Sequence, residues 1–165
     1  MPIENRKSKI ENARLLLALT LPLYALDQLT KWLVLRFIAE DEFIPVIPNF
    51  FNLIRTYNTG AAFSIGQNNN GFFLVLAAAV LAVLLALWFR GKFQQRLTRA
   101  AVALLLAGIA GNLTDRLIHG HVIDFLDVIL PWYGHWPAFN VADSCICVAA
   151  GLLLIGALKE PKNRS

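Results

Sequence analysis

The stretch that decides the fold runs from the end of one long apolar segment to the start of the next. It contains G-N-L-T-D-R at residues 111–116, G-H-V-I-D-F at residues 120–125 and A-F-N-V-A-D-S at residues 138–144. The segments on either side are apolar enough to lie in lipid, where an ionisable side chain is costly and usually has a functional reason. We therefore expect this stretch to be the functional centre of a membrane protein.

The composition supports a membrane protein. Hydrophobic residues make up 57% of the 165 residues and charged residues only 16%, and the mean hydropathy is +0.56. These values are too apolar for a soluble domain. The net charge is +4, and the basic residues cluster outside the apolar segments, where the topology of a membrane protein would place them. Because no zinc-finger spacing or aromatic RNA-binding motif accompanies this charge, no nucleic acid partner is expected.

Four apolar segments are long enough to cross a bilayer, which takes roughly 20 helical residues. They lie at about residues 13–38, 71–89, 98–118 and 139–158. The first continues too far for a cleavable signal peptide, so we expect it to be a retained span. We expect residues 1–165 to form a single membrane-embedded domain, mainly α-helical and polytopic.

The basic residues predict the orientation of these spans. Lys and Arg gather in both tails and after the second span, whereas the connections at residues 39–70 and 119–138 contain only Arg55. By the positive-inside rule both termini are cytoplasmic, and the two poorly basic connections face outward. The polar stretch is then expected near the outer surface of the membrane.

The outer connections contain two further predicted elements. Residues 43–57 are rich in β-branched and aromatic residues interrupted by prolines, which favours short strands in a small periplasmic sheet on the membrane surface. In the second connection, one side of a short interfacial helix is predicted from Val122, Ile123, Phe125, Leu126 and Ile129. Residues typical of the headgroup region follow: Trp132, Tyr133 and Trp136.

Several polar residues have simple structural interpretations. Asp27 and Lys31 are four apart on one helix face, where an internal ion pair would neutralise both charges. Asn112 and Asp115 also share a face, and an arginine nearby would keep Asp115 ionised. That neighbour, Arg116, could instead hold a carbonyl or phosphate group through its planar guanidinium.

The remaining polar residues also have structural interpretations. Asn140 and Asp143 have the spacing of a helix N-cap with its acidic third residue, so capping alone could explain them. Asp127 is interpreted as a solvated surface charge. No metal site is expected, because the histidines lack metal-ligand spacing, and the two cysteines are interpreted as small buried residues. The histidines are taken as interfacial polar residues: His119, His121 and His135.

A pair of aspartates remains as the candidate chemistry. Two aspartates in one confined site cannot both ionise easily, so a protonated member can polarise a carbonyl while an ionised member activates water. Asp143 lies at a helix start and Asp124 in the connection before it. Spacing alone leaves open whether they meet.

Five sequence blocks in chain order resemble one family. They are D-Q-L-T-K (27–31), Y-N-T-G-A-A-F-S (57–64) and the three blocks quoted first. Together they resemble the lipoprotein signal peptidase (signal peptidase II) family of bacterial membrane aspartic peptidases. Val141 stands where leucine is common, which is a conservative change. The resemblance implies a catalytic dyad of Asp124 and Asp143. It further implies that four residues bind or orient substrate, namely Asn58, Asn112, Arg116 and Asn140, and that three are structural, namely Asp27, Lys31 and Asp115.

The resemblance also implies the reaction and its setting. The expected reaction is hydrolysis of a prolipoprotein just before its diacylglyceryl-modified cysteine, at the bacterial inner membrane, without a metal or organic cofactor. Membrane lipid is the other expected partner, and a monomer would suffice. We also expect the outer sheet and residues 120–136 to clamp the substrate over the site.

Two alternative functions belong to other classes of protein. A small transporter could use Asp27, Lys31 and Asp115 as a relay, but the charges gather at one leaflet and no inverted repeat is visible. A lipoprotein-binding scaffold without catalysis would use the same groove but tolerate loss of either carboxylate.

Overall fold

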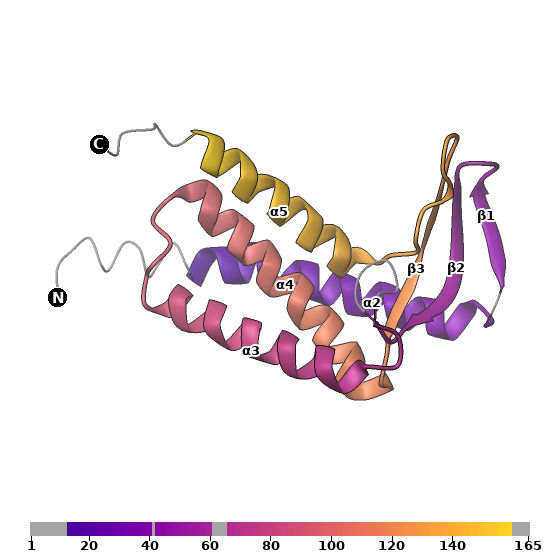
Figure 1. The fold of residues 1–165 in the computed structure, drawn as a ribbon, viewed down its shortest axis with the longest axis horizontal. Helices are drawn as coiled ribbons and strands as arrows, with labels where there is room; N and C mark the ends of the chain where they lie inside the picture. The colour runs from indigo at the N-terminus through magenta and orange to yellow at the C-terminus, as the bar shows by residue number, and fades with distance from the viewer. Residues whose placement is uncertain (1–12, 41, 61–65, 160–165) are drawn as a thin grey trace.

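The computed structural model describes residues 13–40, 42–60 and 66–159. Most of the basic N- and C-terminal tails and residues 61–64 of the Y-N-T-G-A-A-F-S block lie outside these residues. Helices run side by side along the long axis of the molecule, and a small sheet lies across one end of them (Figure 1). The helices are η1 (Leu16–Thr20), α2 (Leu21–Phe37), α3 (Asn70–Phe89), α4 (Arg96–His119) and α5 (Val141–Lys159).

Three helices in the described part of the chain are long and apolar enough to cross a membrane. These are α3, α4 and α5, which correspond to the second, third and fourth predicted spans. The first predicted span corresponds to η1 followed directly by α2, which alone has 17 residues. Pro22 lies at the start of α2, and its missing N–H and bulky ring explain why the helix leaves regular α geometry in the preceding turn.

Helix α4 is the centre of the bundle. It packs against η1, α2, α3 and α5. Half of the residues in its most apolar 18-residue stretch are buried, whereas only 6% are buried in the corresponding stretch of α3. Its glycines allow this close packing. A Cβ atom on Gly108 would lie 2.4 Å from the backbone oxygen of Ala142 in α5, and one on Gly111 would lie 2.5 Å from Oδ2 of Asp27 in α2. The small residues of α4 therefore bring α2 and α5 together.

The sheet is antiparallel, with its strands in the order β1-β2-β3-β4. Its strands are β1 (Phe43–Ile47), β2 (Phe51–Asn58), β3 (Val122–Leu130) and β4 (Gly134–His135). The strands predicted within residues 43–57 are confirmed as β1 and β2. An apolar core formed by Val34, Ile38, Ile123 and Phe125 joins β3 to the last turns of α2.

The predicted interfacial helix is wrong, because residues 122–130 form β3. Its apolar residues satisfy a helical pattern, but residues 122–125 are all buried, as in a strand covered on both faces. Short apolar runs of this kind do not distinguish helix from strand by periodicity alone. Pairing with β2, which places Thr56 opposite Asp124 and Tyr57 opposite Ile123, decides the conformation.

The cysteine prediction is correct for one residue and wrong for the other. Cys145 is buried in an apolar core between α4 and α5. Cys147, two residues later on α5, is exposed, because residues two apart on a helix point to different faces.

Candidate active site

Asn140 brings the two predicted catalytic aspartates together. Its Nδ2 donates to Oδ1 of Asp124 on β3 at 2.8 Å, and its backbone N–H donates to Oδ2 of Asp143 on α5 at 3.2 Å. Its Oδ1 accepts from the backbone N–H of Asp143 at 2.8 Å. This reciprocal pattern is the capping interaction predicted from the sequence, and it fixes Asp143 in the first turn of α5.

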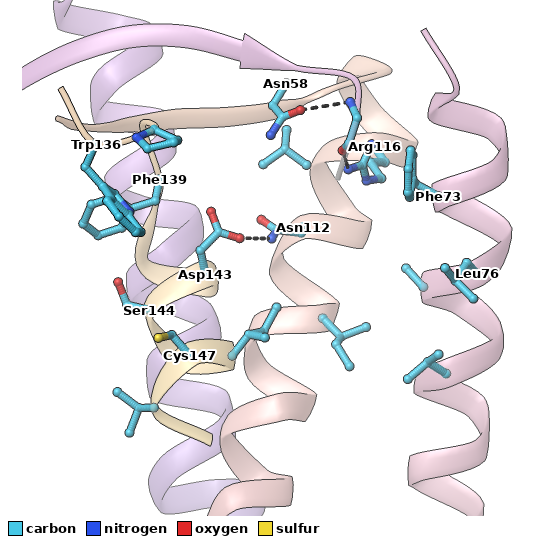
Figure 2. A pocket seen from close by; sticks show the side chains of 18 residues that line it. Asn58, Phe73, Leu76, Asn112, Arg116, Trp136, Phe139, Asp143, Ser144 and Cys147 are labelled. Carbon is cyan, nitrogen blue, oxygen red and sulfur yellow. Dashed lines mark hydrogen bonds between the residues drawn. The ribbon is translucent and has the colours of Figure 1, made fainter. Parts of the chain in front are cut away.

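Asn112 supports Asp143 from the neighbouring helix. Its Nδ2 donates to Oδ1 of Asp143 at 2.7 Å (Figure 2). Its Oδ1 accepts from Nζ of Lys31 at 3.1 Å and from Nδ2 of Asn140 at 3.1 Å. Because an ammonium group can only donate, Lys31 fixes the orientation of the Asn112 amide so that its N–H groups face Asp143.

Asn58 supports the other aspartate from β2. Its Nδ2 donates to Oδ2 of Asp124 at 3.3 Å, while its Oδ1 accepts from the backbone N–H of Gly60 at 2.9 Å (Figure 2). Each aspartate of the pair therefore accepts at least two N–H donors. Three of the four predicted substrate-binding residues touch the aspartates directly.

Arg116, the fourth predicted substrate-binding residue, lies in the same site without a described contact to the aspartates. Its guanidinium donates to the backbone oxygen of Gly60 and to Oδ1 of Asn70, the latter at 3.0 Å. It also lies over the ring of Phe73, 5.3 Å from the centroid. Asn70 was not identified from the sequence; its only signal was a polar turn before the second span.

The three residues predicted to be structural form one buried cluster. Nζ of Lys31 lies 2.9 Å from Oδ2 of Asp27 and 2.7 Å from Oδ2 of Asp115. All three side chains are at most 2% exposed, and Gln28 also donates to both acids. The predicted Asp27–Lys31 pair is confirmed, whereas the described ion-pair partner of Asp115 is Lys31 and not the adjacent arginine.

This cluster also holds the backbone of both elements that carry the aspartate pair. Oδ1 of Asp27 accepts from the N–H of Ala142 at 2.8 Å, one residue before Asp143. Oδ2 of Asp115 accepts from the N–H of Ile123 at 3.2 Å, one residue before Asp124. These contacts give a structural account of all three charges, so none of the three needs a transport relay to explain its burial.

Burial and like charge set the electrostatics of the pair. Burial, and then the negative charge of Asp143, raise the pKa of Asp124 to about 7, against the opposing effect of the hydrogen bonds from Asn58 and Asn140. Such a carboxyl group holds its proton in the neutral range. The pair is therefore suited to sharing one proton near pH 7.

A cavity of about 750 Å³ reaches Asp143 of the aspartate pair (Figure 2). Its polar end is formed by Asn58, Asn112, Arg116 and Asp143, and its walls include apolar side chains of α3, α4 and α5, such as Leu76, Ile109 and Val148. Trp136, Pro137 and Phe139 line it next to the start of α5. We call this cavity the groove. It can hold an apolar chain between helices with a polar, hydrolysable bond at the carboxylates.

The interpretation of Asp127 as a solvated surface charge is wrong. Its side chain is 4% exposed and accepts hydrogen bonds from Asn52 of β2 and His135 of β4. This arrangement was not predictable from sequence patterns, because its members come from three different strands.

Comparisons with known proteins point to one family. A family model described as signal peptidase (SPase) II matches residues 19–159. The chain is 46% identical to the lipoprotein signal peptidase of Syntrophotalea carbinolica, over 92% of this chain and 96% of the relative. It is 48% identical to that of Ralstonia nicotianae, over 84% and 80%. A solved bacterial membrane enzyme, determined by the in meso method, superposes with a TM-score of 0.82 at 29% identity, covering 91% of each chain.

Proposed function

The chain belongs to the signal peptidase II family, and we propose that it is an aspartic endopeptidase that removes the signal peptide of diacylglyceryl-modified prolipoproteins. Cleavage occurs just before the lipidated cysteine. The observation that carries this proposal is the pair Asp124 and Asp143, joined through Asn140, with Asp143 at the polar end of an apolar groove. The groove matches a substrate whose acyl chains and signal segment are apolar and whose scissile bond is polar.

The geometry supports a general acid–base mechanism. Of the two carboxyl groups sharing one proton, the protonated one donates to the scissile carbonyl while the ionised one removes a proton from water, which attacks the carbonyl carbon. The tetrahedral intermediate then collapses, and the leaving amine receives a proton from the pair. Asn58, Asn112 and Asn140 hold the carboxylates in place and orient the substrate. Arg116 has five N–H donors, so it can bind a substrate carbonyl beside its contacts to Gly60 and Asn70.

The proposed placement in the membrane follows from charge and substrate chemistry. Arg90, Lys92, Arg96 and Arg99 lie around the α3–α4 connection, at the end of the bundle opposite the sheet (Figure 1). With η1 and α2 as the first of four spans, both termini are cytoplasmic and the sheet is periplasmic. The site then lies near the outer leaflet of the bacterial inner membrane, where the acyl chains of the substrate are held.

The orientation can be tested by labelling. A cysteine that replaces Trp132 should react with a membrane-impermeant thiol reagent added outside. If this cysteine is protected from the reagent, the orientation is reversed.

A cleavage assay tests the proposed function. Purified protein in detergent should convert a diacylglyceryl-modified prolipoprotein into the signal peptide and the lipidated product, and the unmodified precursor should be a much poorer substrate. Mass spectrometry would locate the cut. Absence of cleavage of the modified substrate, with binding retained, would favour the scaffold alternative.

The raised pKa of Asp124 predicts the pH dependence of the reaction. Activity needs one shared proton, and this proton is lost as pH rises through the pKa of about 7. We therefore expect kcat/KM to fall on the alkaline side with a midpoint near pH 7, measured between pH 5 and 9 with thermal unfolding followed as a control. A rate that stays constant to pH 9 would contradict a shared proton on this pair.

A further inference from the structure

Asp127 lies at the centre of a buried polar cluster that the proposed reaction does not use. Its Oδ2 accepts from Nδ2 of Asn52 at 2.7 Å, and Nδ1 of His135 lies 2.9 Å from both carboxylate oxygens. Because an ionised carboxylate only accepts, Nδ1 of His135 is the donor in these contacts. Asn52 and Asp127 are 1% and 3% exposed, whereas the His135 side chain is 59% exposed. The cluster thus fastens an exposed residue of β4 to the buried centre of the sheet.

The chain after His135 forms a short segment with anchors at both ends. The N–H of Trp136 donates to the oxygen of Val128 at 2.7 Å. At the other end, Phe139 exchanges two hydrogen bonds with Leu126, at 2.8 and 3.1 Å. We call residues 136–138, which run from the first anchor to the residue before the second, the wall segment.

The wall segment separates two cavities. Trp136 and Pro137 line the groove on one side, and on the other side they line a second cavity of about 550 Å³, together with Phe43, Asp127 and His135. Figure 2 shows Trp136 and Phe139 on the same side of the groove as Asp143. A displacement of this segment would therefore widen the groove directly beside the catalytic pair.

The backbone alone holds the start of the wall segment weakly. Strand β4 has two residues and pairs only with β3, at the edge of the sheet, and so short an edge strand adds little stability of its own. A charge-assisted hydrogen bond is about twice as strong as a neutral one. The hydrogen-bonded contact between Asp127 and His135 therefore adds to the edge contact of the His135 ring with Phe43 in holding β4.

We propose that Asp127 and His135 are positioning residues for substrate binding, which hold the wall segment against the groove. This inference rests on the proposed function, because substrate in the groove gives the wall its role. The contact lies outside the catalytic pair, so it affects how tightly the substrate is held and leaves the chemical step unchanged. It also assigns a role to a carboxylate that sequence analysis placed at the surface.

The test compares two substitutions of the exposed histidine. His135→Leu removes the donor, whereas His135→Asn keeps an N–H donor close to the position of Nδ1. We expect His135→Leu to raise KM for the lipidated prolipoprotein about five- to tenfold and to leave kcat within about twofold of the wild-type value. This is the result expected when a variant loses binding energy that the ground state and the transition state share equally. His135→Asn should recover most of the affinity. His119→Leu, the same change at another exposed histidine, is the matched control.

A second readout needs no substrate. Cys147 is exposed and lines the groove, so its alkylation rate reports how open the groove is. This rate should rise several-fold in His135→Leu and remain unchanged in His135→Asn and His119→Leu. An unchanged rate and an unchanged KM in His135→Leu would overturn the inference, as would a fall in kcat at constant KM. If the wild-type protein does not cleave, the proposed function fails, and the alkylation rates still decide the role of the wall segment.

Discussion

Replacing Asp124 or Asp143 with asparagine is expected to lower kcat by about a thousandfold or more, within the range that loss of acid–base catalysis produces. An asparagine keeps the shape of the side chain but can neither give nor take the shared proton. Because each aspartate acts only together with the other, the double substitution should be little worse than either single one. The measurement is single-turnover cleavage of the diacylglyceryl-modified prolipoprotein.

Binding and folding must be measured in the same variants. Both oxygens of Asp143 accept hydrogen bonds, from Asn112 and from the N–H of Asn140, and an asparagine provides only one acceptor oxygen. Some loss of thermal stability is therefore expected, but substrate binding should persist. Asp127→Asn is the matched control: it changes a buried carboxylate on the same strand as Asp124, and it should change KM while leaving kcat nearly constant. Cleavage near the wild-type rate in either dyad variant would exclude that aspartate as a catalyst.

The elements around the dyad differ in how far the sequence determines them. The span helices follow from long apolar runs, and the start of α5 follows from the spacing of Asn140 and Asp143. Strand β3 does not, because V-I-D-F-L-D-V-I-L fits one side of a helix as well as a doubly covered strand. Its conformation depends on β2, which lies far away in the chain and provides the pairing partners.

Side-chain partners were predictable only where they lie close in sequence. The Asp27–Lys31 pair is separated by one helical turn, and periodicity alone places both on one face. The contact between Lys31 and Asp115 joins α2 to α4, and the contact between Asp127 and His135 depends on a hairpin that was not predicted. The resemblance to known peptidases indicated the candidate site residues, but their contacts required the tertiary structure.

Lys31 is expected to be the residue outside the dyad whose loss does most damage. Lys31→Met leaves two carboxylates, Asp27 and Asp115, buried without their described cation. Removing one partner of a buried ion pair costs about 3–5 kcal/mol, and we expect a loss of this size in the free energy of unfolding. The loss should extend to activity, because Asp27 holds the N–H beside Asp143 and Asp115 holds the N–H beside Asp124.

The measurement is denaturant unfolding in detergent, with cleavage assayed where the variant remains folded. Arg36→Met makes the same kind of change on an exposed residue of α2 and should alter stability by no more than about 0.5 kcal/mol. Adding Asp115→Asn to Lys31→Met removes one of the two unpaired charges, so it should restore part of the stability. Activity should stay low in this double variant, because Asn112 would still lack the ammonium group that orients its amide toward Asp143. If Lys31→Met is as stable as Arg36→Met, the cluster does not hold the catalytic elements together.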